Sequence, residues 1–333
     1  MLPYGAIMAT AGAAASAGRC GLQALVLPLL ALAVAQALWV PTAGAWRHRR
    51  GFVAECVARC AIRRPREHTG IHTVPLGLAV IAGGVATLAA DGAGRWAATL
   101  AWTCLGLSWL FTLLCVGRFA WALARRRAAL WAVDGAWFLV PAALLGAGLA
   151  ADAAGRLEAG NPATMLRTLA LAAVVLGWFG YWAIAAAALL RIRRYGFRGV
   201  PQAPWWIGMG CAGLAAAALG TTLQGSSSHV WLQASLTDAM VATVIVAIIL
   251  CVPVLAGSAA FLVYRCSYRA RAAWPPTFST AVFALGCLKS GEVLDSDPLR
   301  WLGLGAGYAT LLFWAITIAW NTRCTCVARF EHR

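Results

Sequence analysis

The chain has 333 residues, of which 62% are hydrophobic and only 11% are charged, and its formal net charge is +16. A soluble globular domain carries about 25% charged residues, so this composition excludes an ordinary soluble protein and indicates a polytopic membrane protein. In a soluble protein the positive charge would suggest nucleic-acid binding, but in a membrane protein basic residues collect in cytoplasmic loops. We therefore expect the lipid bilayer as a partner of this chain, and no nucleic acid.

Apolar runs separated by charged or Pro/Gly/Ser-rich breaks predict ten membrane-spanning helices. The first and ninth runs are the weakest, so the count is open by one. The first run begins almost at Met1, lacks the basic residues of a signal peptide and is followed at once by a second run. We interpret it as a helix that is kept, and we expect the natural chain to begin slightly upstream. The ten predicted spans are 3–18, 21–46, 70–90, 95–121, 136–152, 164–190, 204–223, 236–264, 275–290 and 299–320.

The basic residues predict how these helices are oriented. Twenty arginines lie in the loops that follow every second span, seven of them in a basic loop over 47–69, whereas five basic residues lie in the opposite loops. Because Lys and Arg are retained on the cytoplasmic side, this loop and both termini are predicted to be cytoplasmic, in a protein of the cell membrane. Arg47, Arg49 and Arg50 directly follow the second span, and we predict that they form a cytoplasmic mouth that attracts anions.

The odd-numbered spans begin at intervals of 66 to 71 residues. Such a period indicates an internal repeat. Each unit would cross outward and return, so the units would share one orientation, as do parallel repeats around an axis along the membrane normal. The sequence thus predicts an all-α membrane protein, a single transmembrane domain over 1–333, with ten helices as five parallel helical hairpins around a central pore. The predicted hairpins are 1–46, 70–121, 136–190, 204–264 and 275–320.

The two helices of each predicted hairpin differ in composition. The odd spans are short and rich in glycine, whereas the even spans are longer and carry more Trp and Leu, as in TLAWTCLGLSWLFTLLCVG. Bulky side chains suit lipid, and small ones suit close helix packing or a lumen. We therefore predict an inner ring of odd helices and an outer ring of even helices. A tightly packed bundle without a lumen is the alternative that the pattern leaves open.

Hydroxyl side chains on the odd spans are candidates for the lining of a pore, and two prolines are candidates for kinks that expose backbone dipoles to an anion. The candidate kinks are Pro75 and Pro141. No Asp or Glu lies away from the ends of the spans, although ion-coupled carriers usually need an intramembrane carboxylate or histidine. His72, near the inner mouth, is either a proton relay or a passive interfacial residue. The candidate pore-lining residues are Thr10, Thr73, Thr277, Ser279 and Thr280.

Neither an enzyme nor a cofactor is predicted, because the sequence shows no nucleophile elbow, P-loop or other catalytic motif. The eleven cysteines are odd in number and lie mostly in apolar runs, so we expect free thiols and no disulfide framework. A metal site is the alternative, but its spacing is not the usual CxxC, so no metal is predicted. Its ligands would come from Cys56 and Cys60 with His48 and His68, or from Cys324 and Cys326.

Five short stretches at the starts or cores of the odd spans resemble one known family. They are PYGAIMATAG, HTVPLGLAVIAG, AWFLVPAALLG, APWWIGMGCAG and FSTAVFALG. By their order and spacing, nearly the whole chain resembles the tellurite-resistance/dicarboxylate transporter family, which includes fungal malate permeases, sulfite efflux proteins and the slow-type anion channels of plant guard cells. The resemblance implies ten helices in five hairpins around a central pore, often in a homotrimer, and small anions as the transported partners.

The resemblance also implies a phenylalanine on the ninth helix that plugs the pore and is commonly followed by proline. The stretch VFALG places Phe283 at this position, with Ala284 in place of the proline, which removes a kink. Phe283 lies nine residues from Trp274 and six from Lys289, and is therefore near the middle of the membrane. We predict that Phe283 is the pore gate, and an ordinary core aromatic is the alternative.

The predicted function is the passage of small anions through the pore by a channel or uniporter-like permease, including C4-dicarboxylates. An apolar lumen with a few hydroxyls and an arginine-rich mouth passes partly dehydrated anions with weak selectivity. Two alternatives stay open. One is a proton-coupled dicarboxylate carrier or a sulfite or tellurite efflux protein. The other is a membrane enzyme or scaffold that transports nothing.

Overall fold

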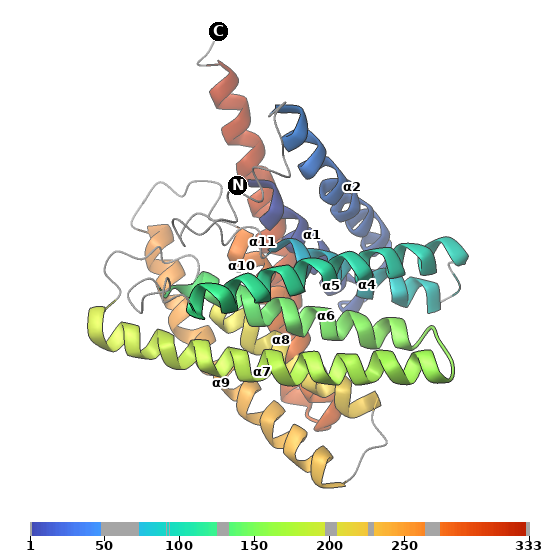
Figure 1. Cartoon of the computed structure of the whole chain (residues 1–333). Helices are drawn as coiled ribbons and strands as arrows, with labels where there is room; N and C mark the ends of the chain where they lie inside the picture. Colours follow the sequence, from blue (N-terminus) through green and yellow to red (C-terminus); the bar gives the residue numbers. More distant parts are fainter. Residues whose placement is uncertain are drawn as a thin grey trace.

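The computed structural model describes residues 2–47, 73–90, 92, 94–124, 133–196, 205–225, 230–263 and 274–330, which form ten α-helices and one short 3-10 helix (Figure 1). The predicted all-α class is therefore confirmed. One helix from each predicted hairpin is short, and we call these five the inner helices: α1 (Leu2–Arg19), α4 (Thr73–Ala90), α6 (Leu139–Gly155), α8 (Trp206–Gly225) and α10 (Trp274–Val293). Their successors are α2 (Gln23–Arg47), α5 (Arg95–Ala124), α7 (Asn161–Tyr195), α9 (Val230–Val263) and α11 (Asp297–Phe330), and the 3-10 helix η4 (Gly135–Phe138) leads into α6.

The helices have the length and apolarity of a membrane domain. The inner helices have 17 to 20 residues and their successors 25 to 35. At about 1.5 Å per residue, even the inner helices are about 26–30 Å long, close to the thickness of a bilayer core. Within the described part of the chain, seven helices are long and apolar enough to cross a membrane: α4, α5, η4 with α6, α7, α8, α9 and α11. A multi-pass membrane protein is confirmed, and ten spans remain a prediction.

The weak ninth run becomes a full-length helix in the structure. Its uncharged part, from Pro275 to Leu288, has only fourteen residues. The helix continues past Lys289 to Val293 and reaches 20 residues. Because α1, α8 and α11 pack along it, α10 needs no apolar surface of its own toward lipid.

Each inner helix packs along its successor in the sequence, and the inner helices also contact one another in a closed order. This order is α1, α4, α6, α8, α10 and back to α1. Contacts at both ends show that α8 and α10 run parallel, since Gly210 lies against Ser279 and Gly220 against Lys289. These contacts establish which helices are neighbours. The five-fold repeat and a pore along its centre remain predictions.

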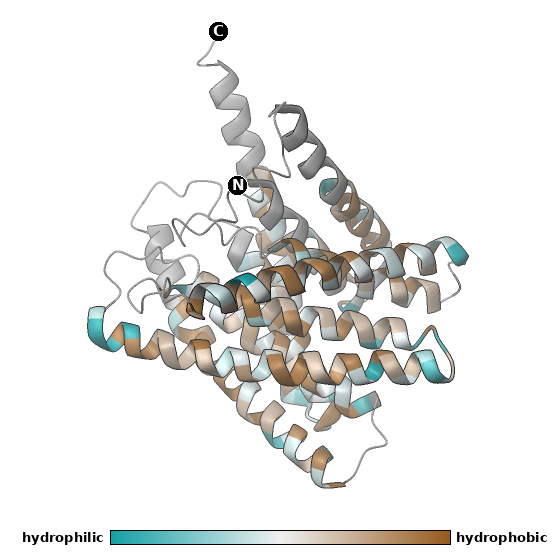
Figure 2. Ribbon diagram, in the orientation of Figure 1, coloured by the Kyte–Doolittle hydropathy of each residue, from teal (hydrophilic) through white to brown (hydrophobic). Residues whose placement is uncertain are grey.

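Burial separates the two groups of helices. In their most apolar stretches, 83% of the residues of η4 with α6 and 89% of those of α8 are buried, compared with 22% to 33% for α5, α7, α9 and α11. The exposed side chains of these four outer helices include Leu113, Leu176, Ile249 and Trp301, and Figure 2 shows many hydrophobic residues along the ribbons of α5, α7 and α9. Such surfaces suit lipid contact, which agrees with the predicted division into inner and outer helices.

Glycines bring α8 and α10 very close together. A Cβ atom added to Gly213 would lie 2.6 Å from the Cα atom of Phe283, and one added to Gly210 would lie 2.8 Å from the Cα atom of Ser279. Gly286 of α10 meets the backbone carbonyl of Gly213 in the same contact. Because any side chain at these positions would push the two backbones apart, the small residues here serve close helix packing.

The predicted topology can be tested with fused reporters. A reporter after Arg333 is expected to read cytoplasmic, and one inserted in 224–234 is expected to read external, because that segment contains no Lys or Arg. A parallel insertion in the basic 47–69 loop should read cytoplasmic and serves as the control. A cytoplasmic reading for 224–234 would contradict the ten-span topology.

Candidate anion pathway

The contacts of α10 identify which of its faces points toward the middle of the inner helices. Gly286 lies against α8 and Ala281 lies against α1, and Thr280 is hydrogen-bonded to Thr310 of α11. Successive residues of an α-helix are about 100° apart. The face between the α1 and α8 contacts is therefore opposite the α11 contact, and residues on it point inward.

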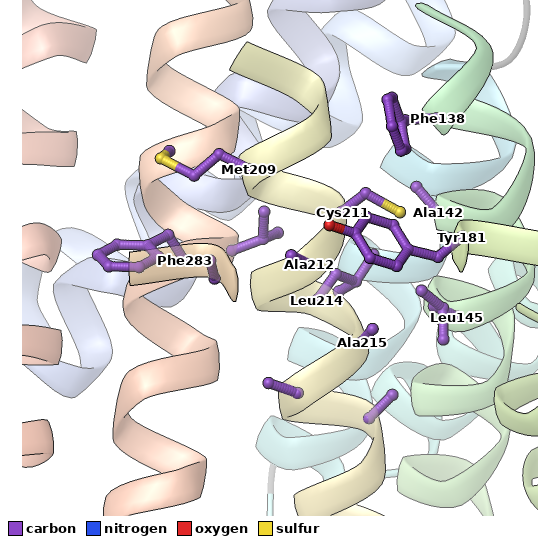
Figure 3. Close-up of a cluster of buried hydrophobic side chains, with 14 of the residues drawn as sticks. Phe138, Ala142, Leu145, Tyr181, Met209, Cys211, Ala212, Leu214, Ala215 and Phe283 are labelled. Carbon is purple, nitrogen blue, oxygen red and sulfur yellow. The ribbon is translucent and has the colours of Figure 1, made fainter. Parts of the chain in front are cut away.

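Two buried phenylalanines of α10 lie on different faces of the helix. Phe278 is 1% exposed and Phe283 is 3% exposed. They are five positions apart in the helix, so their side chains leave it about 140° apart. Phe278 lies on the inward face, where its ring is 3.8 Å from the position of a Cβ on Gly12 of α1. Phe283 lies between the positions that face α8 and those that face α11, and in Figure 3 its ring points away from Cys211 and Tyr181.

Sequence reasoning missed Phe278, although the stretch FSTAVFALG contains both aromatics. The spacing in that stretch carried no information about which side of α10 faces a neighbour. Only the contacts with α1, α8 and α11 separate the two faces.

Two of the five predicted pore-lining hydroxyls face the outer helix α11. The Thr10 hydroxyl accepts a hydrogen bond from Nε1 of Trp314 at 3.2 Å. The Thr280 hydroxyl accepts one from the Thr310 hydroxyl at 3.1 Å and donates to the backbone oxygen of Pro276 at 2.8 Å. These hydroxyls are therefore occupied in helix contacts.

The other three predicted hydroxyls are buried as well. Thr73 is the first residue of α4. Thr277 and Ser279 are 0% exposed, and their hydroxyl oxygens have no hydrogen-bond partner among the described residues. An unpaired buried hydroxyl costs free energy, so these two keep the capacity to bind a polar ligand. They lie on different faces of α10, and the Ser279 side chain faces Gly210 of α8.

The two candidate kink prolines lie in the first turns of their helices. Pro75 is the third residue of α4, and its carbonyl accepts a hydrogen bond from the Ser108 hydroxyl of α5 at 2.8 Å. Pro141 is the third residue of α6, directly after η4. A proline in the first turn removes no intrahelical hydrogen bond, so neither residue breaks a helix interior. A proline within a helix is found at Pro253 of α9.

The predicted cytoplasmic mouth lies largely outside the described residues. Arg47 is the last residue of α2, and Arg49 and Arg50 are not among the residues that the structure describes. The cysteines and histidines of the 47–69 loop also lie outside them. The structure therefore leaves the mouth as a prediction.

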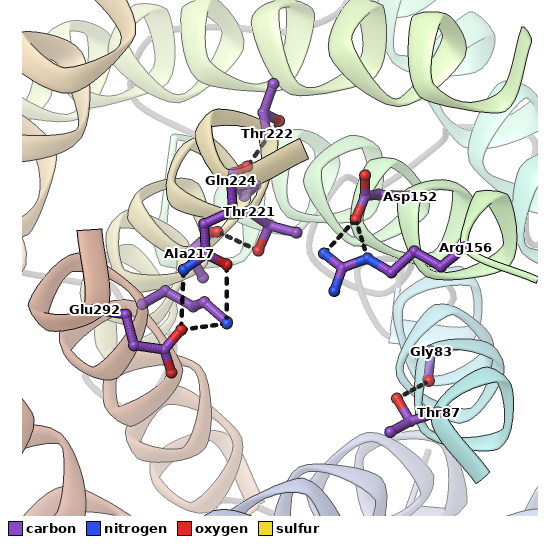
Figure 4. Close-up of polar contacts among 11 residues, drawn as sticks. Gly83, Thr87, Asp152, Arg156, Ala217, Thr221, Thr222, Gln224 and Glu292 are labelled. Atoms are coloured by element: carbon purple, nitrogen blue, oxygen red, sulfur yellow. Dashed lines mark hydrogen bonds and ion pairs between the residues drawn. The ribbon is translucent and has the colours of Figure 1, made fainter. Parts of the chain in front are cut away.

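The acidic residues of the inner helices are all paired with cations. The sequences of α1, α4 and α8 contain no Asp, Glu or His. Asp152, in the last turn of α6, accepts hydrogen bonds from Arg156 at 2.8 and 3.1 Å. Glu292, at the end of α10, forms an ion pair with Lys289 (Figure 4). No carboxylate in the described inner helices is thus left unpaired in the middle of the bundle.

These features define a polytopic α-helical membrane protein whose inner helices are apolar and whose few charges are at helix ends. Residues 3–322 match the family model of the voltage-dependent anion channels. The chain therefore belongs to the voltage-dependent anion channel family, and the resemblance found in the sequence is confirmed. No curated protein sequence matches the chain. Members of this family are channels or transporters of anions and not enzymes.

Proposed function

We propose that the protein passes small anions passively through a pathway between its inner helices, as a channel or uniporter. The observation that carries this proposal is the pairing of every acidic residue on the described inner helices. A carrier that couples to protons needs an intramembrane group that binds and releases them, and paired carboxylates at helix ends do not supply one. The pathway would select weakly among anions by their cost of dehydration, and C4-dicarboxylates are among the proposed substrates.

A closed pathway is the state that best fits the burial of α8. Every residue from Trp206 to Thr221 is buried, so no part of this stretch of α8 borders open solvent. A gate on the adjacent α10 would explain the closure. Phe283 is the gate that the sequence predicts, and the inward face of α10 favours Phe278 for the same role. We propose that one of these two rings closes the pathway.

The proposed function is tested by anion flux into proteoliposomes that contain the purified full chain. Chloride, nitrate and malate flux is expected to follow an imposed membrane voltage and to continue without a pH gradient. Liposomes without protein are the control. Flux that requires a pH gradient would favour the proton-coupled carrier or efflux alternative, in which His72, outside the described residues, would be the first relay candidate. The absence of flux for all three anions would contradict transport of small anions.

We also propose a homotrimer, supported by the family resemblance and by the large apolar surface of the outer helices. Lipid covers part of that surface and neighbouring subunits would cover the rest. The mass of the protein–detergent complex, corrected for detergent, is expected to correspond to three chains of 35.0 kDa. A mass of one chain would contradict the trimer.

Neutralising the predicted cytoplasmic mouth should slow anion entry. Changing Arg47, Arg49 and Arg50 together to Gln is expected to reduce anion flux from the cytoplasmic side and to weaken its dependence on ionic strength. Charges at a mouth raise the local anion concentration within a screening length of about 8–10 Å. The measurement is initial flux at low and high salt, with orientation checked by the reporter after Arg333. Unchanged flux in a correctly oriented protein would show that these arginines only set topology.

A further inference from the structure

The last turn of α10 holds a carboxylate in a position where a small free anion would fit. The ammonium group of Lys289 contacts the carboxylate of Glu292, one turn further along the helix, and donates to the amide oxygen of Gln224 in α8 at 3.3 Å. The amide nitrogen of Gln224 donates to the same Glu292 oxygen at 3.1 Å. Figure 4 shows this arrangement between α8 and α10.

The groups around Glu292 are mostly donors and cations. From α1, Arg19 interacts electrostatically with Glu292, and from α8 the facing group is the neutral Gln224. On α10 itself the partner is Lys289. From α11, the stem of Arg300 packs against Gly291, but its guanidinium is bound by Asp295 and Asp297 at 2.7 and 2.9 Å.

This environment keeps Glu292 ionised. Burial raises the pKa of its carboxyl group, but the hydrogen bonds from Lys289 and Gln224 and the charges of Lys289 and Arg19 outweigh burial, so the pKa lies below its usual value. One cation, Lys289, and one amide N–H, from Gln224, thus contact the negative charge. The same donors are suited to a small monovalent anion such as nitrate or chloride.

The pair is unequally exposed, which makes Glu292 the displaceable partner. The Lys289 side chain is 17% exposed and the Glu292 side chain is 43% exposed. Glu292 is also the penultimate residue of α10, where its side chain has room to turn outward. Exposed ion pairs contribute little to stability, so an incoming anion replaces a weak interaction.

Lys289 also lies above the proposed gate. It is eleven residues beyond Phe278, on the same inward face of α10 and about 16 Å along its axis. Leu285 lies between them on this face and is half-buried. An anion bound by Lys289 would therefore stand at the entrance of the proposed pathway, at the end of the bundle where α1 and α10 end.

We propose that Lys289 and Gln224 form a binding site for a small monovalent anion, and that the Glu292 carboxylate occupies this site as a tethered competitor. The inference rests on the proposed function for its role in transport, but binding itself is measured separately. The predicted topology places the site on the external side.

The test measures nitrate binding to the purified full chain. Binding is detected as a rise in melting temperature when sodium nitrate replaces sodium gluconate at constant ionic strength. Glu292→Gln keeps the shape of the side chain and removes its negative charge. We expect this variant to lower the apparent Kd for nitrate about tenfold, which corresponds to the free energy of one modest charge-assisted hydrogen bond. Adding Lys289→Gln to it should abolish the gain. Glu292→Ala is the second neutral variant should the glutamine variant not fold.

The matched control is Asp295→Asn, which removes one negative charge from the same end of the bundle. Asp295 has a left-handed backbone, with φ of 48°, a conformation that Asn also accepts. Its variant should bind nitrate like the wild type. Equal shifts for Asp295→Asn and Glu292→Gln, or no shift for either neutral variant of Glu292, would overturn the proposed site. Nitrate flux in the same preparations distinguishes the binding site from the proposed transport function. Tighter nitrate binding by Glu292→Gln without any flux would support the site and contradict transport. Flux without tighter binding would support transport and contradict the site.

Discussion

Replacing Phe278 by alanine is expected to raise anion flux severalfold per folded molecule. Its ring is buried on the inward face of α10, beside Gly12 of α1, and truncation would open space between helices that otherwise carry small side chains. The measurement is voltage-driven chloride flux in proteoliposomes, normalised to folded protein, together with the melting temperature of each variant.

Phe283→Ala is the matched comparison, because the same side chain is removed from another face of the same helix. If Phe283 only fills the core between α8 and α11, its loss costs roughly 3–5 kcal/mol of stability without a gain in flux. If Phe283 is the gate, as the sequence predicts, Phe283→Ala raises anion flux and Phe278→Ala lowers stability without a gain in flux. Unchanged flux in both variants would remove the aromatic gate altogether.

Replacing Gly213 by valine is expected to destabilise the protein strongly. The new Cβ would lie 2.6 Å from the Cα of Phe283 and 2.9 Å from its backbone nitrogen. Neither backbone atom can turn away as a flexible side chain can, so α8 and α10 must separate. Overpacking of this kind costs typically 1–3 kcal/mol and occasionally more, and thermal unfolding in detergent should show a clear drop in melting temperature.

Gly305→Ala is the control for this change. Gly305 lies in α11, is exposed, and has open space where a Cβ would stand. Since alanine is favoured over glycine in a helix interior by roughly 0.5–1 kcal/mol, this variant should be as stable as the wild type or slightly more stable. A Gly213→Val protein as stable as the Gly305→Ala protein would show that the α8–α10 contact is looser than the structure has it.

The odd and even helices could be distinguished from sequence because lipid and protein impose different demands. Glycine-rich α8 is buried, whereas Leu- and Trp-rich α5 is largely exposed. This contrast is a property of composition, and it does not need the three-dimensional positions of the residues. The charge-free run of α10 was more ambiguous, because its helix gains its last turn from Lys289 to Val293, a segment that looks like a loop by hydropathy.

The roles of single residues could not be predicted in the same way. Thr10 and Thr280 are predicted to line a pore, and in the structure their hydroxyls are hydrogen-bonded to Trp314 and Thr310 of α11. A helix that is apolar on every side has no polar stripe to show which side faces a partner. The hydroxyls therefore gave no information on direction until neighbouring helices were in place.

The amino-acid sequence is sufficient to identify a multi-pass helical membrane protein with short and long helices and with stretches that resemble an anion channel family. These properties depend on composition and order along the chain. The packing of the helices was needed to identify the inward face of α10 and the contacts of one Glu292 oxygen with both Lys289 and Gln224. Gln224 and Glu292 are 68 residues apart. A contact between residues so far apart in the sequence depends on how α8 and α10 pack. The glycines at which the two helices approach determine how each helix is rotated about its own axis.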